Sequence, residues 1–230
     1  MEHEHISTSY DVELNELRQS ILDMGSKVCL MIANSVKSVV DRDTPLAERT
    51  ILLDKEINAA EVSIDEQCLE LLALRQPTAR DLRFITLALK IVTNLERIGD
   101  KCANIAKRAR VLNEEPKLKP YIDIPRMGHW VEVMVREALE SFVRGDLALA
   151  VKVCKDAGFM NDLNDKLQRE LLTYMMEDTA TIPRAIKIIY ISKALDRISD
   201  HATNIAEMVI FMIKGKDIRH TKVEIFENDL

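Results

Sequence analysis

The sequence is poor in the residues that build sheets and tight turns. Aromatic residues make up 4% of its 230 positions, and there are only six glycines and six prolines. Hydrophobic residues still account for 47% of the chain and charged residues for 30%. Helix formers therefore outweigh the β-branched and aromatic runs that are typical of strands. This composition predicts an all-α fold, and the length is sufficient for one large domain or two smaller units.

Positively charged residues are fewer than negatively charged ones. The 32 Lys and Arg residues are outnumbered by 38 Asp and Glu residues, which gives a net charge of −6. Nucleic-acid binding draws its affinity from clustered cations that displace counterions from phosphates. No nucleic-acid partner is therefore expected.

The chain lacks a recognisable targeting or membrane segment. Its first residues, including His3, Glu4 and His5, do not form the basic region and apolar region of a signal peptide, and no apolar run is long enough to span a bilayer. We therefore expect a cytoplasmic protein.

Cysteine spacing excludes the common cysteine-based sites. The four cysteines, Cys29, Cys68, Cys102 and Cys154, are scattered and form no Cys-x-x-Cys pair. This pattern favours reduced thiols facing a core over disulfides or zinc ligands.

Catalytic motifs are missing as well. There is no glycine-rich phosphate loop, no Ser-His-Asp or Cys-His pattern of recognisable spacing, and no pair of Glu-x-x-His sequences of the kind that builds di-iron bundles. His201 directly follows Asp200, so on a helix it points about 100° away from that carboxylate and is expected at a surface or edge. The chain is not expected to be an enzyme.

What the chain does contain is a long internal repeat. Leu95–Ala106 returns one hundred residues later as Leu195–Ala206, with Leu, Arg, Ile, Asp, Asn, Ile and Ala unchanged and Glu replaced by Asp. Apolar residues could recur because both copies need a core, but the recurring acids, Arg and Asn indicate a shared polar task. Repetition at a fixed period predicts two copies of one structural unit.

Hydrophobic periodicity predicts three helices in each unit. The apolar spacing of three and four, together with breaks at prolines and charged turns, places helices at about 10–40, 45–74, 78–112, 125–143, 147–176 and 184–214. The segment 114–120, with two prolines among charges, is the expected linker. The prediction is two tandem antiparallel three-helix bundles, residues 1–113 and 121–214, joined end to end or side by side, and a polar tail at 215–230.

The repeated motif places oxygen-bearing side chains on one helix face, opposite the apolar stripe. Residues at i, i+4 and i+8 share a face, and these are Glu96, Asp100 and Asn104 in the first copy and Asp196, Asp200 and Asn204 in the second. Carboxylates one turn apart repel each other and are a poor choice for a merely solvated face. A hard cation bound by carboxylate and amide oxygens is the simplest explanation. A partner's basic surface is the alternative, and it would make the chain a metal-free helical adaptor.

The preceding helix supplies a second set of oxygen ligands in the first unit. Asp54, Asn58, Glu61 and Asp65 also share one face, so an antiparallel neighbour could bring them against the motif. The related stretch of the second unit has Asn161 and Asn164 and fewer acids on that face. Two similar sites are predicted, of which the second is weaker.

These residues resemble the PhoU family of phosphate-signalling regulators. The resemblance rests on Glu/Asp-Arg-Ile-x-Asp-x-x-x-Asn-Ile-Ala near the end of each half and on Leu71–Ile85 before the first copy, and it covers the chain from about Tyr10 to Lys214. It implies two three-helix bundles, dimerisation and negative control of phosphate uptake and of the phosphate-starvation response. It also implies contact with the ATPase subunit of a phosphate ABC transporter and with a membrane sensor histidine kinase, so that the chain would meet the membrane only through partners.

The resemblance further implies a set of metal ligands. Carried over position by position, they are Asp54, Asn58, Glu61, Glu96, Asp100, Asn104, Asp196, Asp200 and Asn204. The bound ions would be divalent or trivalent, with iron, manganese, magnesium, zinc and nickel as candidates. The family commonly has an acid at the position of Ala157, which is displaced here to Asp156. Arg97 and Arg197 match the motif as partners of the acids and not as ligands.

Overall fold

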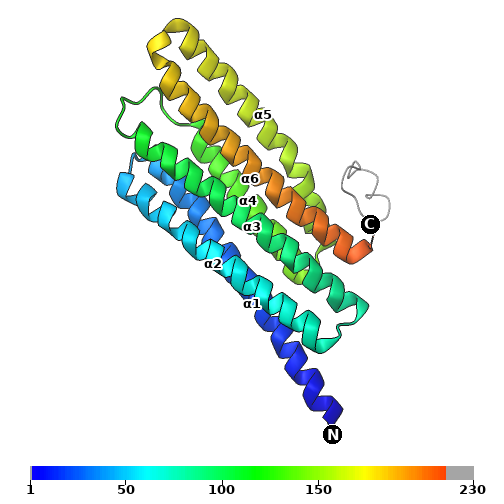
Figure 1. Cartoon of the computed structure of the whole chain (residues 1–230). Coiled ribbons are helices and arrows are strands. Elements are labelled where there is room, and N and C mark those ends of the chain that lie inside the picture. The colour runs from blue at the N-terminus through cyan, green and yellow to red at the C-terminus, as the bar shows by residue number, and fades with distance from the viewer. Residues whose placement is uncertain (1, 216–230) are drawn as a thin grey trace.

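The structure is a computed structural model that describes residues 2–215, and long helices lie side by side throughout it (Figure 1). The helices are α1 (Glu2–Val40), α2 (Thr44–Arg75), α3 (Ala79–Leu112), α4 (Asp123–Arg144), α5 (Leu147–Glu177) and α6 (Ile182–Lys214), with a short 3-10 turn η1 (Thr179–Thr181) before α6. No strand occurs in the described range. The all-α prediction is confirmed.

The predicted helix ends agree with the structure to within a few residues, except at the start of the chain. There α1 begins at Glu2, so the start predicted near Tyr10 is wrong. The first residues have no apolar periodicity, but they also contain no proline or glycine that would end a helix. The extra turns extend past the other helices (Figure 1). The predicted polar tail lies, apart from Gly215, outside the described residues.

The connection between the first and second helices has the same construction in both halves. The carboxylate of Asp43 caps α2 by accepting a hydrogen bond of 2.8 Å from the backbone N–H of Leu46. In the second half, Asp146 caps α5 by accepting one of 3.0 Å from Leu149. Such a cap satisfies a donor that the helix itself leaves free, and it stabilises the helix by about 1 kcal/mol. The internal repeat therefore extends to the turns as well as to the motif.

The two halves lie side by side and share one hydrophobic core. Helix α3 packs along α6, and α1 packs along α4. The inward stripe of each motif is fully buried, as its spacing predicted: Ile91, Leu95, Ile98, Cys102, Ile105 and Ala109 in α3, and Leu195, Ile198, Ala202, Ile205 and Val209 in α6. The buried residues of both halves form a single continuous cluster. The end-to-end alternative is thereby excluded.

The linker between the halves is held at several points. The guanidinium of Arg42 donates from Nη2 to the carbonyl oxygens of Asn113 and Glu115, each at 2.6 Å. From the other half, Arg184 donates to the carbonyl of Pro116 at 3.1 Å. The segment between α3 and α4 is thus fixed to both bundles.

All four cysteines are free. Cys68 and Cys102 are fully buried, while Cys29 and Cys154 are half-buried at the edge of the core. Burial raises the pKa of Cys29 to about 11 and that of Cys154 to about 12, which keeps these thiols protonated at neutral pH. The prediction of core-facing thiols is confirmed, because Cys68 and Cys102 lie inside the core and Cys29 and Cys154 pack against it.

Between residues 2 and 215, none of the helices combines the length and the apolar character needed to cross a membrane.

Candidate functional site

The first acidic face lies where α2 runs beside α3. Helix α2 supplies Asp54, Asn58 and Glu61, and helix α3 supplies Glu96, Asp100 and Asn104. The two helices approach closely at Gly99, where a Cβ would stand 3.2 Å from Cγ2 of Ile57. This close approach brings the polar edges of the two helices together, as the sequence predicted.

Two acids of this face, Glu96 and Asp54, have raised pKa values. Partial burial raises the pKa of Glu96, and the neighbouring Glu61, Asp100 and Asp54 raise it further, against the opposite effect of Arg97. Burial likewise raises the pKa of Asp54, followed by the charge of Asp100. Four carboxylates contributed by two helices therefore share one electrostatic environment.

The positive and neutral partners present at this face are weak. Oδ1 of Asp54 is buried and has no hydrogen-bond partner. Asp100 accepts a long hydrogen bond of 3.4 Å from the amide of Asn104 and lies 3.6 Å from Nζ of Lys101. Asn58 is exposed and forms no hydrogen bond within the described part of the chain. Electrostatic or hydrogen-bond contacts thus link five of the predicted residues, Asp54, Glu61, Glu96, Asp100 and Asn104, and Asn58 takes no part in those contacts.

The second acidic face lies between α5 and α6 and carries less charge. Partial burial raises the pKa of Asp196, as do the charges of Asp200 and Asp165, while Arg197 lowers it. Oδ1 of Asp196 is buried without a hydrogen-bond partner, and so is Oδ1 of Asn164 on α5. The carboxylates that act on one another here are three, Asp165, Asp196 and Asp200, against four at the first face.

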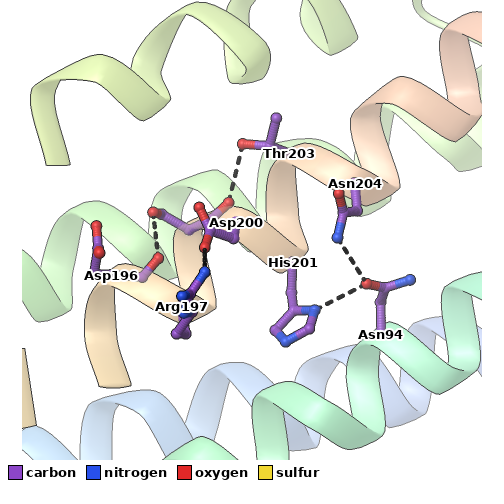
Figure 2. A network of polar contacts seen from close by, with 8 residues as sticks. Asn94, Asp196, Arg197, Asp200, His201, Thr203 and Asn204 are labelled. Carbon is purple, nitrogen blue, oxygen red and sulfur yellow. Dashed lines mark hydrogen bonds and ion pairs between the residues drawn. The ribbon is translucent and has the colours of Figure 1, made fainter. Parts of the chain in front are cut away.

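Two predicted members of the second face, Asp200 and Asn204, already have polar partners within the chain (Figure 2). The carboxylate of Asp200 forms an ion pair of 2.8 Å with Arg197. The amide of Asn204 is directed toward α3, where it donates to Oδ1 of Asn94 at 3.4 Å. This contact is possible because α6 packs against α3 as well as against α5.

The displaced acid of α5 does not replace the missing ligand. Asp156 lies toward α4, where its carbonyl accepts a hydrogen bond of 3.3 Å from the indole of Trp130. Its carboxylate is 3.9 Å from Nζ of Lys152. Burial raises the pKa of Asp156, and the charge of Glu137 on α4 also raises it, while the charge of Lys152 lowers it. None of these contacts reaches the motif on α6.

Sequence reasoning missed Asn94, which joins the two halves. Its Oδ1 lies 3.0 Å from Nδ1 of His201 and also accepts from Asn204 (Figure 2). Asn94 directly precedes the first motif copy, but Ala194 stands at the same place in the second, so the repeat carried no signal for it. His201 is half-buried where α6 faces α3, which agrees with the predicted edge position.

The donor chemistry of the first face fits a hard cation. Carboxylate and amide oxygens are the ligands that such ions prefer, and the unpartnered Oδ1 of Asp54 is a buried acceptor that a cation would satisfy. Among residues 2–215, however, no three His, Cys, Asp or Glu side chains are gathered closely enough to hold one ion. Closing a coordination sphere here would require the acidic side chains to rotate toward each other.

Comparisons with known proteins identify relatives over almost the whole chain. The PhoU domain family matches residues 21–109 and again 124–209. The chain is 42% identical over 217 residues to the phosphate-specific transport system accessory protein PhoU homolog of Pseudomonas aeruginosa, covering 94% of this chain and 90% of that protein. It is 33% identical over 216 residues to the phosphate-specific transport system accessory protein PhoU of Escherichia coli, with the same two coverages.

Solved structures agree with this fold. The crystal structure of PhoU from Pseudomonas aeruginosa has a TM-score of 0.87 at 40% identity and covers 90% of this chain and 100% of that one. The phosphate transport system regulatory protein PhoU from Streptococcus pneumoniae has a TM-score of 0.84 at 29% identity, covering 90% of this chain and 98% of that one. The two matched segments of the domain family correspond to the two bundles.

Proposed function

This chain belongs to the PhoU family, and we propose that it is an accessory protein of a phosphate transport system that restrains phosphate uptake and the phosphate-starvation response by protein contact. The observation that carries the proposal is the double match to the PhoU domain, one for each bundle. The relatives are named for accessory and regulatory roles and not for catalysis, which agrees with the expected absence of enzymatic activity.

The proposed partners are the ATPase subunit of the phosphate transporter and the membrane sensor histidine kinase of the phosphate response. A protein that connects two complexes needs more than one surface, and the side-by-side bundles expose the two acidic faces on different helix pairs, α2–α3 and α5–α6. We propose that the chain works as a homodimer in the cytoplasm and meets the membrane only through these partners.

We further propose that the first acidic face binds a divalent or trivalent cation. When bound, the ion would neutralise carboxylates that otherwise repel one another. Asp54, Glu61, Glu96 and Asp100 are its proposed ligands, because each contributes to the shared electrostatics of that face. Neutralisation would fix the surface that α2 and α3 present to a partner.

The second acidic face supports a different role. Asp200 is already paired with Arg197, and Asn204 is bonded to Asn94. An acidic surface whose charges are partly satisfied within the chain suits a partner's basic residues better than it suits a metal ion. The metal-free adaptor therefore remains the second candidate, and it is favoured at this face.

The regulatory proposal is tested with a phosphate-starvation reporter in phosphate-rich medium. Deletion of the gene should derepress the reporter, and the wild-type gene should restore repression, while Asp100→Ala combined with Asp200→Ala should fail to do so at equal protein level. Full rescue by the double variant would keep the regulator and remove these carboxylates from its action. A reporter unchanged by deletion would refute the assignment to phosphate control.

A further inference from the structure

A second polar site lies at the end of the bundle remote from the linker, where α1, α3, α4 and α6 meet. A pocket of about 380 Å³ is lined there by four arginines, one aspartate and an apolar floor. We call it the arginine pocket, and its members are Arg18, Arg80, Asp81, Arg83, Phe84, Phe142, Val143, Arg144, Gly145, Met212 and Ile213. Neither acidic face contributes a residue to it.

The positive charge of this pocket is largely uncompensated. Arg144 is paired with Glu140 at 2.9 Å. Arg18, Arg80 and Arg83 form no ion pair anywhere in the range that the structure describes, although the chain as a whole carries a net charge of −6. In an acidic protein, three guanidinium groups without an ion pair around one recess create a local positive potential that attracts anions.

The arginines are held in place by contacts other than ion pairs. Nη1 of Arg18 donates to Oδ1 of Asn15 at 2.7 Å, and its guanidinium lies 4.7 Å from the ring centroid of Phe84. Phe84 is stacked on Phe142, with centroids 5.1 Å apart. Nε of Arg83 donates to the carbonyl of Ala79 at 3.4 Å. These contacts occupy few guanidinium donors, so the arginines retain N–H groups for a ligand.

The helix geometry adds to this preference for an anion. Arg80 and Arg83 lie in the first turns of α3, whose N-cap Thr78 makes no side-chain bond to the backbone. The first N–H groups of a helix and its dipole favour negative charge at that end. The hydroxyl of Thr78 instead donates to Oδ2 of Asp81 at 2.9 Å.

The single acid in the pocket distinguishes between anions. A carboxylate among arginines repels a fully ionised anion but accepts a hydrogen bond from one that still carries a proton. At neutral pH inorganic phosphate keeps a proton, whereas sulfate has none and a phosphate monoester, whose second pKa is about 6, has mostly lost it. Asp81 therefore favours inorganic phosphate over both alternatives.

We propose that the arginine pocket binds inorganic phosphate, with Arg18, Arg80 and Arg83 donating hydrogen bonds to its oxygens and Asp81 accepting a hydrogen bond from its protonated oxygen. Planar guanidinium groups bind phosphate oxygens through paired N–H donors. The proposed ligands come from α1 and α3 of the first half, and residues of α4 and α6 line the rest of the pocket. The proposal does not depend on the regulatory role, because it concerns the purified chain alone.

The test is calorimetric titration of the purified full-length chain at pH 7.5 and low ionic strength with inorganic phosphate, sulfate and AMP. Phosphate should bind at one site per chain, with sulfate and AMP weaker by about tenfold or more. Arg80→Gln combined with Arg83→Gln should weaken phosphate binding by about tenfold or more. Arg110→Gln, an exposed arginine elsewhere on α3, is the matched control and should change nothing.

Asp81→Asn tests the role of the acid separately. This variant should still bind anions but lose the preference for phosphate over sulfate, and thermal melting of each variant in the absence of ligand would verify that it folds. The proposal is overturned by phosphate binding that survives the double arginine substitution, by equal affinity for sulfate in the wild type, or by no binding at millimolar phosphate. Displacement of phosphate by an oligo-glutamate peptide at lower concentration than phosphate itself would instead make the pocket a docking site for acidic peptides.

Discussion

The imidazole of His201 on α6 lies 3.0 Å from the amide oxygen of Asn94 on α3, through its Nδ1 atom. The amide nitrogen of Asn94 donates to the carbonyl of Lys90 at 2.8 Å, so its oxygen faces α6 as an acceptor. His201 therefore donates from Nδ1, which selects the tautomer that carries its proton there. This bond crosses between the two halves directly beside the motif of α6.

The stability of the protein should depend on pH through His201. Burial lowers the pKa of His201, and the positive charges of Arg97, Lys101 and Arg197 lower it further. Only the negative charge of Asp200 acts in the opposite direction. Below an unfolded-state pKa of about 6.5 the unfolded chain binds the proton more readily than the folded one, so the free energy of unfolding should fall as the pH drops from about 7 toward 5. Urea unfolding at a series of pH values measures this slope.

His201→Gln should flatten that part of the pH profile, while His129→Gln, at an exposed position on α4, should leave it unchanged. Asp54, Glu96 and Asp196, whose pKa values are raised, affect stability in the opposite sense as the pH falls, so only the difference between these variants isolates the histidine. Parallel profiles for His201→Gln and the wild type would contradict the prediction.

Asp54→Asn should stabilise the protein in the presence of a chelator. Burial and the charge of Asp100 raise the pKa of Asp54, so its ionised form is unfavourable in the folded state at every pH above that raised pKa. A neutral amide of the same shape removes the repulsion, and we expect a gain of about 0.5–1 kcal/mol in the free energy of unfolding at pH 7. Urea unfolding with EDTA present measures it, and Asp162→Asn at an exposed position of α5 is the control.

The same variant should lose stabilisation by metal. A cation that binds only the folded chain raises the melting temperature with its concentration, so manganese should stabilise the wild type and leave Asp54→Asn nearly unaffected. The N-terminal His3 and His5 should be removed from both proteins, because they could bind metal on their own. Equal stabilisation of both proteins would refute a cation site at the first face.

Gly128→Ala should destabilise the contact between α1 and α4. A Cβ at this position would stand 2.6 Å from Cγ2 and 3.0 Å from Cγ1 of Val36, and the β-branched valine cannot rotate away easily. Overpacking of this kind costs about 1–3 kcal/mol. A Val36→Ala substitution in the same chain should recover part of the loss.

Gly158→Ala is the matched control for that change. Gly158 is an exposed helical residue of α5, and a Cβ there meets nothing within 4 Å. Alanine should stabilise this position by about 0.5–1 kcal/mol, because it loses less backbone entropy on folding than glycine. Thermal unfolding of both variants gives the comparison, and destabilisation by Gly158→Ala would show that the assumed helical geometry is wrong.

The parts of the structure that the sequence predicted are those that depend on one helix at a time. Apolar spacing located the helices, and the position of Ile98 and Cys102 in the buried stripe placed Glu96 and Asp100 outside the core. These features follow from the 3.6-residue period alone. The proximity of Glu61 to Glu96 required only that neighbouring helices pack antiparallel.

The features that the sequence did not predict depend on which helices of the two halves meet. Asn204 shares a face with Asp200 in the helix, yet it bonds to Asn94 because α6 packs against α3. The arginine pocket unites Arg18 of α1 with Arg144 at the end of α4, and no local pattern links positions so far apart. Both features follow from the side-by-side arrangement, which the repeat left open.

The two acidic faces should contribute unequally to repression. The charge of Asp200 is offset by Arg197 at 2.8 Å. Asp100 raises the pKa values of Asp54 and Glu96, and its ion-pair partner among the described residues is Lys101 at 3.6 Å. At the first face a bound cation would offset the negative charge, so loss of Asp100 would remove one of its ligands. At the second face Arg197 already offsets the charge of Asp200, so loss of Asp200 should matter less. In the phosphate-starvation reporter, Asp100→Ala should therefore reproduce most of the derepression caused by deletion, while Asp200→Ala should retain most of the repression.

Arg197→Gln provides the complementary measurement at the second face. Removing this arginine leaves Asp196 and Asp200 without their nearest positive charge, so binding of manganese by the purified protein should increase and then disappear when Asp200→Ala is added. Equal reporter activity for Asp100→Ala and Asp200→Ala at equal protein level would contradict the asymmetry. It would mean that both faces act as partner-binding surfaces, whose effect depends on their negative charge and not on the ion that offsets it.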